Sequence, residues 1–82
     1  MPLYVGIHKF PANSDEKLIN EGWPKYKDAC EKKGAKAIRI GYNLELGKGH
    51  CITEAPSEKE VKEAHDEIGQ IPEDIFEIQT KE

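Results

Sequence analysis

Residues 50–69 read HCITEAPSEKEVKEAHDEIG, and this stretch decides the fold. Its first half alternates in the manner of a short strand. Its second half has four residues at helical spacing that are expected to face the core: Val61, Ala64, His65 and Ile68. Ser57, followed three residues later by Glu60, is a typical helix start, and Gly69 marks the helix end. The stretch therefore predicts a strand that leads directly into an amphipathic helix.

The flanking sequence predicts three further strands and one further helix. The expected strands cover residues 3–10, 35–43, 48–55 and 75–79, and the expected helices cover about 13–33 and 57–69. Asn13 and Glu16 resemble a capping box at the start of the first helix. Pro24 lies inside that helix and predicts a kink or break near Gly22 and Trp23.

The order strand, helix, strand, strand, helix, strand predicts a single domain over residues 1–82. Two right-handed βαβ crossovers around a central hairpin give a four-stranded antiparallel sheet with both helices on one face. This is the ferredoxin-like split βαβ arrangement of the α+β class.

Pairing across the central hairpin predicts which side chains share a face. A four-residue turn places Asn43 opposite Lys48, so that Ile40 faces Cys51. By the same count Ile38 faces Thr53. Cys51 is therefore expected on the apolar, helix-covered side of the sheet.

The other face of the sheet carries no helix in this fold. The side chains expected there are Tyr4, His8, Phe10, Arg39, His50, Ile52 and Glu54. A mixed aromatic and aliphatic surface of this kind predicts a dimer interface or a binding cleft.

Composition excludes several classes of protein. The 82 residues carry a net charge of −4 with no basic run, which argues against nucleic-acid binding. No apolar stretch approaches the roughly 18 residues of a membrane span, and the N-terminus has a strand pattern rather than a secretion signal. We therefore expect a cytoplasmic protein whose two cysteines are thiols or ligands, and a small core favours a homodimer.

Two groups of side chains are candidates for chemistry. On the helix side, Cys51 and His65, with Cys30 as a third candidate, suit a soft or borderline divalent metal such as nickel, zinc or copper. The alternative is that the buried cysteine packs as a small hydrophobe and the histidine is a hydrogen-bonded core residue.

The second group is expected on the open face, where His8, His50 and Glu54 suit zinc, nickel or non-haem iron. A dimer across that face would double the number of ligands. The alternative is a solvated edge with scattered polar residues, which is favoured for His50. His8 is the better candidate because its neighbours Tyr4 and Phe10 indicate partial burial.

Four segments of the chain resemble a known family. They are the start MPLYVGIHKFP (residues 1–11), CITEAP (residues 51–56), His65 within the second helix, and GQIPEDIFEI (residues 69–78). They are similar to a small ferredoxin-like family, mostly of unknown function, that includes an actinobacterial nickel-binding protein.

The resemblance implies a dimeric protein able to bind nickel or a similar divalent transition metal. By position, the recurring polar residues of the family match His8, Cys51, Glu54 and His65. Where many relatives carry a histidine and an aspartate in the first helix, this chain has Trp23 and Tyr26, which implies a weaker site or none.

Three functions follow as competing hypotheses. The leading one is a small cytoplasmic metal-binding protein in metal homeostasis or sensing. The second is a metal-free enzyme or small-molecule-binding protein whose cleft lies between sheet and helices, lined by Trp23, Tyr26, Cys51 and His65. The third is a structural or regulatory module that docks a partner on the open face. No nucleophile elbow or phosphate-binding glycine loop is present.

Overall fold

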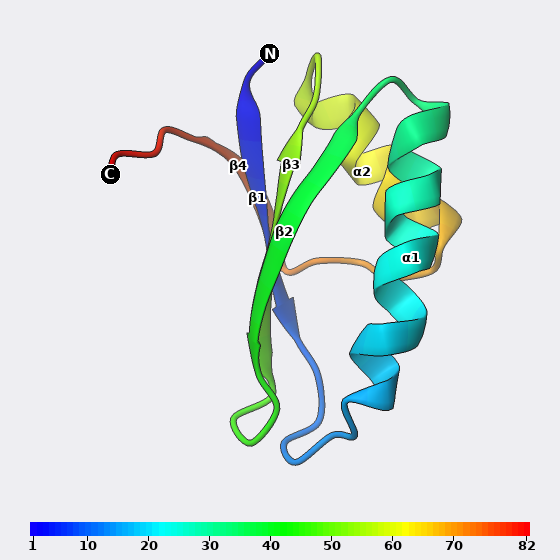
Figure 1. Cartoon of the computed structure of the whole chain (residues 1–82), viewed down its shortest axis with the longest axis vertical. Coiled ribbons are helices and arrows are strands. Elements are labelled where there is room, and N and C mark those ends of the chain that lie inside the picture. Colours follow the sequence, from blue (N-terminus) through cyan, green and yellow to red (C-terminus); the bar gives the residue numbers. More distant parts are fainter.

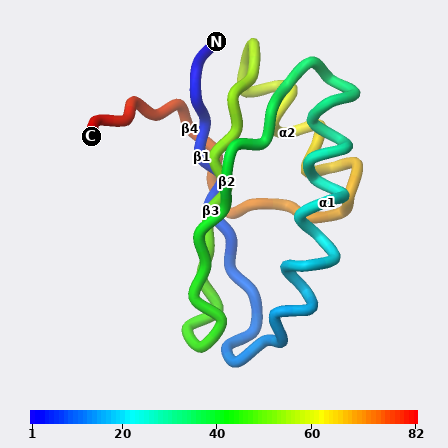
Figure 2. Tube along the Cα trace, viewed as in Figure 1, coloured from blue at the N-terminus to red at the C-terminus, as the bar shows by residue number.

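A computed structural model describes all of residues 1–82. The elements are β1 (Leu3–Lys9), α1 (Lys17–Lys32), β2 (Lys36–Asn43), β3 (Lys48–Glu54), α2 (Glu58–Glu67) and β4 (Asp74–Ile78). Figure 1 shows α1 and α2 side by side on one face of a twisted sheet, with the other face uncovered. The ferredoxin-like βαββαβ prediction is confirmed, and Figure 2 follows the two crossovers along the chain.

The sheet places β1 and β3 at its centre, because the strand order is β2-β3-β1-β4 and all neighbours are antiparallel. Between the central strands, Gly6 lies opposite Cys51 and His8 lies opposite Gly49. Paired residues project from the same side of a sheet, and alternate residues along a strand share that side. Gly6, His8 and Cys51 therefore all face the helices.

This register corrects the expected membership of the open face. Tyr4 is 7% exposed and belongs to the core between sheet and helices, and His8 shares its side of β1. Phe10 approaches Gly49 on that same side. The more apolar set of β1, which includes Val5, lies on the open face instead, where it pairs with Ile52. Apolarity alone indicated the wrong face, because Gly6, the residue of β1 that admits Cys51 and His65, shares its side of the strand with Tyr4 and His8.

A bulge in β2 changes one predicted pair. Ile40 lies opposite Cys51 as predicted, but Thr53 pairs with Ala37 rather than with Ile38. The register shifts between Ala37 and Arg39, so Ile38 is the extra residue of the bulge and is left outside the regular pairing.

The first helix begins later than predicted and is not broken. It starts at Lys17, whose backbone N–H donates to the Asp15 carboxylate, while Asn13 has a φ of 60° in the preceding turn. The helix runs through Pro24 to Lys32. Pro24 lies on the exposed side of the helix, where water can hydrate the carbonyl that loses its partner.

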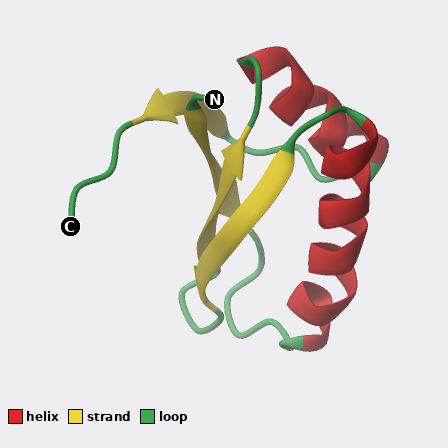
Figure 3. Cartoon of the chain, turned by 45° about the horizontal axis from the view of Figure 1, so that its top comes forward, coloured by secondary structure: helices red, strands yellow, loops and turns green.

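The second helix lies where it was predicted, although the Ser57 hydroxyl donates to the Glu60 carboxylate instead of accepting from a backbone N–H of the helix. Val61, Ala64 and His65 are its buried residues, and Gly69 follows its end with a φ of 72°, a conformation that glycine adopts without strain. Figure 3 shows α2 as the shorter of the two helices. Neither helix combines the length and the apolar character needed to cross a bilayer.

Candidate metal centre

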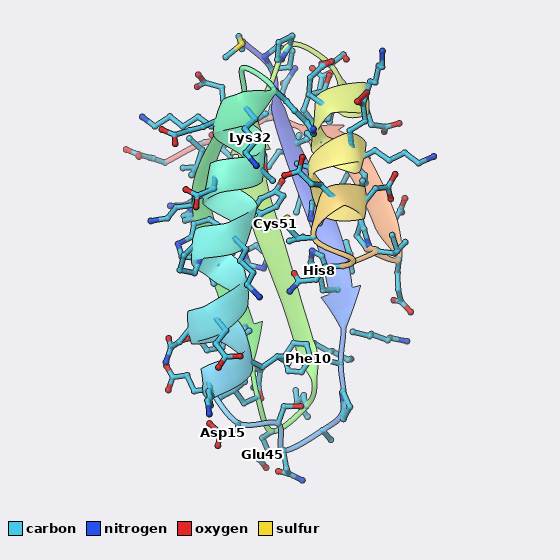
Figure 4. The ribbon with its side chains drawn as sticks, turned by 90° about the vertical axis from the view of Figure 1, so that its right-hand side faces the viewer. His8, Phe10, Asp15, Lys32, Glu45 and Cys51 are labelled. Carbon is cyan, nitrogen blue, oxygen red and sulfur yellow. The ribbon has the colours of Figure 1, made fainter.

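Three donor side chains from three elements meet on the helix side of the sheet. The Cys51 Sγ of β3 lies 3.3 Å from the Nε2 of His65 in α2 and 3.6 Å from the Nε2 of His8 in β1. One potential ligand atom from each residue lies within 4.8 Å of the other two. Figure 4, viewed from the helix side, shows Cys51 and His8 between the two helices. The predicted meeting of thiol and imidazole inside one subunit is confirmed.

The orientation of the His65 ring is determined by the backbone of its own helix. Its Nδ1 lies 2.8 Å from the carbonyl oxygen of Val61, one turn earlier. A carbonyl oxygen can only accept, so Nδ1 carries the proton and donates. In the neutral ring the Nε2 lone pair then points at Cys51, which is the arrangement that protein ligands of metals commonly have.

Tyr26 of α1 packs behind His65 and closes the interior side of the group. The centroids of the two rings are 4.4 Å apart, and the Tyr26 hydroxyl is hydrogen-bonded to Thr53 Oγ1 of β3. The buried hydroxyls of Tyr26 and Thr53 therefore each have a hydrogen-bond partner. Tyr26 thus forms an aromatic wall beside the His65 ring.

Gly6 makes the close approach of the three elements possible. A Cβ at this position would lie 2.9 Å from the Cys51 Sγ and 3.5 Å from the His65 Nε2. A glycine inside a strand is a signal of such close approach, and this signal was present in the sequence but was not used. Gly6 is thus the residue that leaves space for the donor atoms.

Replacing Gly6 with alanine is expected to destabilise the protein by about 1–3 kcal/mol, because the new methyl group overpacks the buried thiol. Chemical denaturation of the Gly6→Ala, Cys51→Ala and double variants would measure this. The cost should fall by at least about 1 kcal/mol in the Cys51→Ala background, where the clashing sulfur is gone. Additive effects in this cycle would contradict the proposed contact.

Burial sets the charge state of the group. Removal from water lowers the pKa of His8 to about 4, and the neighbouring His65 adds to this effect. Burial also lowers the pKa of His65 and raises the pKa of the Cys51 thiol to about 11. At pH 7 the group is therefore two neutral imidazoles and a neutral thiol, with the thiol able to donate to the His65 Nε2.

The separations suit a tetrahedral metal. A zinc–sulfur bond of about 2.3 Å and zinc–nitrogen bonds of about 2.0–2.1 Å place sulfur and nitrogen about 3.6 Å apart at a tetrahedral angle. The two sulfur–nitrogen distances here are 3.3 and 3.6 Å. A divalent ion thus matches both sulfur–nitrogen distances, once the thiol has lost its proton.

Other candidate ligands lie elsewhere. Glu54 pairs with Leu3 and projects to the open face, opposite to Cys51, so the structure does not bring it into the group. His50 is exposed and packs across Gly41 on that open face. Cys30 is fully buried in α1 but is not among the clustered donors. The open-face set of His8, His50 and Glu54 therefore does not form, because His8 faces the helices.

A cavity of about 370 Å³ opens in front of the three donors. His8, Cys51 and His65 lie in its wall together with Trp23 and Tyr26. The cavity exists because α2 has 10 residues and α1 has 16, so one end of the sheet is covered by α1 alone. A cleft between sheet and helices, lined by all four residues predicted for it, is thus present.

The fold and this side-chain group define a small ferredoxin-like α+β protein with a buried Cys-His-His cluster. Among solved structures, SCO4226 from Streptomyces coelicolor A3(2) matches the chain with a TM-score of 0.88 over 98% of this chain and 99% of the Streptomyces chain. The two share 14% sequence identity, a level at which the likeness shows the fold alone. No family model and no curated protein matches the chain.

Proposed function

We propose that this protein binds one divalent transition metal through Cys51, His65 and His8. One observation carries the proposal: a thiol and two imidazoles from three separate elements lie within 4.8 Å of one another, with the His65 lone pair already directed at the shared centre. A core histidine that served packing alone would not require a second histidine and a cysteine at its free nitrogen.

The donor set selects among metals by its chemistry. One thiolate and two imidazoles suit nickel, zinc, copper or cobalt better than calcium or magnesium, which prefer oxygen. Nickel is the physiological candidate that the family resemblance suggests. The test is elemental analysis of protein purified without a metal-affinity tag, followed by titration of the metal-free protein with nickel and zinc. Protein that carries no metal and binds neither ion would refute the proposal.

We further propose a role in metal homeostasis or sensing in the cytoplasm. Both cysteines are free thiols, which agrees with a reducing compartment.

The uncovered sheet face, with Phe76 45% exposed beside buried Val5 and Ile52, is the surface through which we expect a homodimer. Native mass measurement tests this arrangement independently of metal binding.

Metal binding is expected to release a single proton, and the pH dependence of the metal affinity should show this. At pH 7–9 both imidazoles are already neutral because their pKa values are lowered, so only the Cys51 thiol, with its pKa of about 11, loses a proton on binding. Protons compete with the metal for sulfur, so affinity should rise about tenfold for each pH unit in this range. Histidine protonation should steepen the dependence only below pH 6.5, because the pKa values of both imidazoles are lowered.

Calorimetric titration with zinc in buffers of different ionisation enthalpy measures the number of protons released. One proton per metal at pH 7.5 is the expected result. Release of two or more would show that the histidines are charged in the metal-free protein, contrary to their burial. Release of none would show that the thiol is not a ligand.

A further inference from the structure

The three donors of the proposed metal centre leave one tetrahedral position without a protein ligand. Zinc sites that serve only structure are closed by four protein ligands, whereas sites that act on a ligand keep a position open. Here His8, Cys51 and His65 all line the cavity, so a ligand would reach the open position of a bound metal from that side. No aspartate or glutamate lines the cavity to occupy the position.

The cavity beyond the donors is built to hold an apolar body. Its volume of about 370 Å³ lies in the range of small-molecule sites. The aromatic and aliphatic side chains in its wall include Phe10, Leu18, Ile19, Trp23, Ile40 and Tyr42. Figure 4 places Phe10 on the same side of the sheet as Cys51, between it and the turn that carries Glu45. A ligand that reaches the metal must therefore pass between hydrophobic walls.

Charge balance selects the group that meets the metal. A divalent ion bound by one thiolate and two neutral imidazoles retains one positive charge, and an unbalanced charge in apolar surroundings is costly. The one lysine in the cavity wall, Lys9, is exposed and lies 3.6 Å from the Glu73 carboxylate, so it brings no negative charge to the centre. An anionic donor neutralises the centre, whereas a cationic ligand would be repelled.

From these observations we propose that the cavity binds a small monocarboxylate with an aromatic or branched aliphatic body. The carboxylate takes the open position on the metal, and the body packs against Trp23, Ile40 and their apolar neighbours. The inference rests on the proposed metal binding and extends it, because it assigns the cavity and the donor group to one site. The bound metal would then serve as the binding site for an organic acid, and the protein would not bind the metal ion alone.

Benzoate is the probe for this proposal, with zinc as the metal. Calorimetric titration of the zinc-loaded protein should show one benzoate site, at least about tenfold tighter than in the metal-free protein. Benzyl alcohol has the same body without the charge, and acetate has the charge without the body. Each should bind at least about tenfold more weakly than benzoate.

A variant in the cavity wall separates the two parts of the site. Trp23→Ala should weaken benzoate binding by at least about fivefold and leave zinc affinity within about twofold, because Trp23 is not among the donors. Phe76→Ala removes an exposed aromatic side chain on the open face and should change neither affinity.

The outcomes distinguish this inference from the proposed function. Zinc binding without benzoate binding overturns the inference and leaves the metal site intact. Equal benzoate affinity with and without zinc, or equal affinity for benzyl alcohol, also overturns it, since the metal would then play no part. Failure to bind zinc, nickel or another divalent metal overturns both.

Discussion

Replacing Cys51 with alanine is expected to weaken nickel and zinc binding by more than about a hundredfold. Loss of a residue that merely supports a metal ligand typically costs 10–100-fold, and Cys51 is the central donor, with contacts to both histidines. A competition titration against a coloured chelator measures the affinity. With cobalt, the sulfur-to-metal absorption of the parent protein should disappear.

Cys30→Ala is the matched control for this variant. Cys30 is as deeply buried as Cys51, so its replacement removes a sulfur atom from the same core without removing a clustered donor. It should lower stability by a similar amount and leave metal affinity within about twofold. Equal metal affinity in the Cys51→Ala variant and the parent would refute the proposed centre.

Replacing His65 with alanine is expected to cost about 2–4 kcal/mol of stability in the metal-free protein and to prevent metal binding. His65 is the largest of the fully buried side chains, and the substitution leaves a cavity beside Tyr26 and removes the hydrogen bond to Val61. In a domain of this size the melting temperature should fall by at least about 10 °C. Zinc, which should raise the melting temperature of the parent, should not rescue the variant.

Two further variants make this result interpretable. His50→Ala removes an exposed imidazole on the open face and should change stability by less than about 0.5 kcal/mol. His65→Gln keeps most of the volume and should recover part of the stability without recovering metal binding. A His65→Ala protein that melts with the parent, or gains stability from zinc as the parent does, would contradict the assigned roles.

The architecture was predictable because it depends on local sequence patterns, namely hydrophobic periodicity, helix ends and turn length. The stripe of Val61, Ala64 and His65 and the stop at Gly69 defined α2, and the four-residue turn between Asn43 and Lys48 defined the hairpin register. That register placed Cys51 on the helix side, and the stripe placed His65 there as well. The proximity of Cys51 and His65 followed from these local features.

The third donor and the cavity were harder to predict because they depend on tertiary packing. Alternation in β1 separates Val5 from His8, but it does not say which of the two faces the helices. The answer depends on Gly6, whose missing side chain admits Cys51 and His65. The prediction chose the more apolar face and so assigned His8 to the wrong group. The cavity likewise depends on the difference in length between α1 and α2.

The wide sequence separation of the donors has a consequence for the life of the protein in a cell. His8 and Cys51 are 43 residues apart and Cys51 and His65 are 14 apart, so only the folded chain holds all three donors close together. At a free-ion concentration a hundred times the dissociation constant, binding to the native state would raise the free energy of unfolding by about 2.7 kcal/mol. This is a large share of the stability of a small domain. Metal starvation would then expose the chain to proteases, and cellular abundance would follow the supply of the ion.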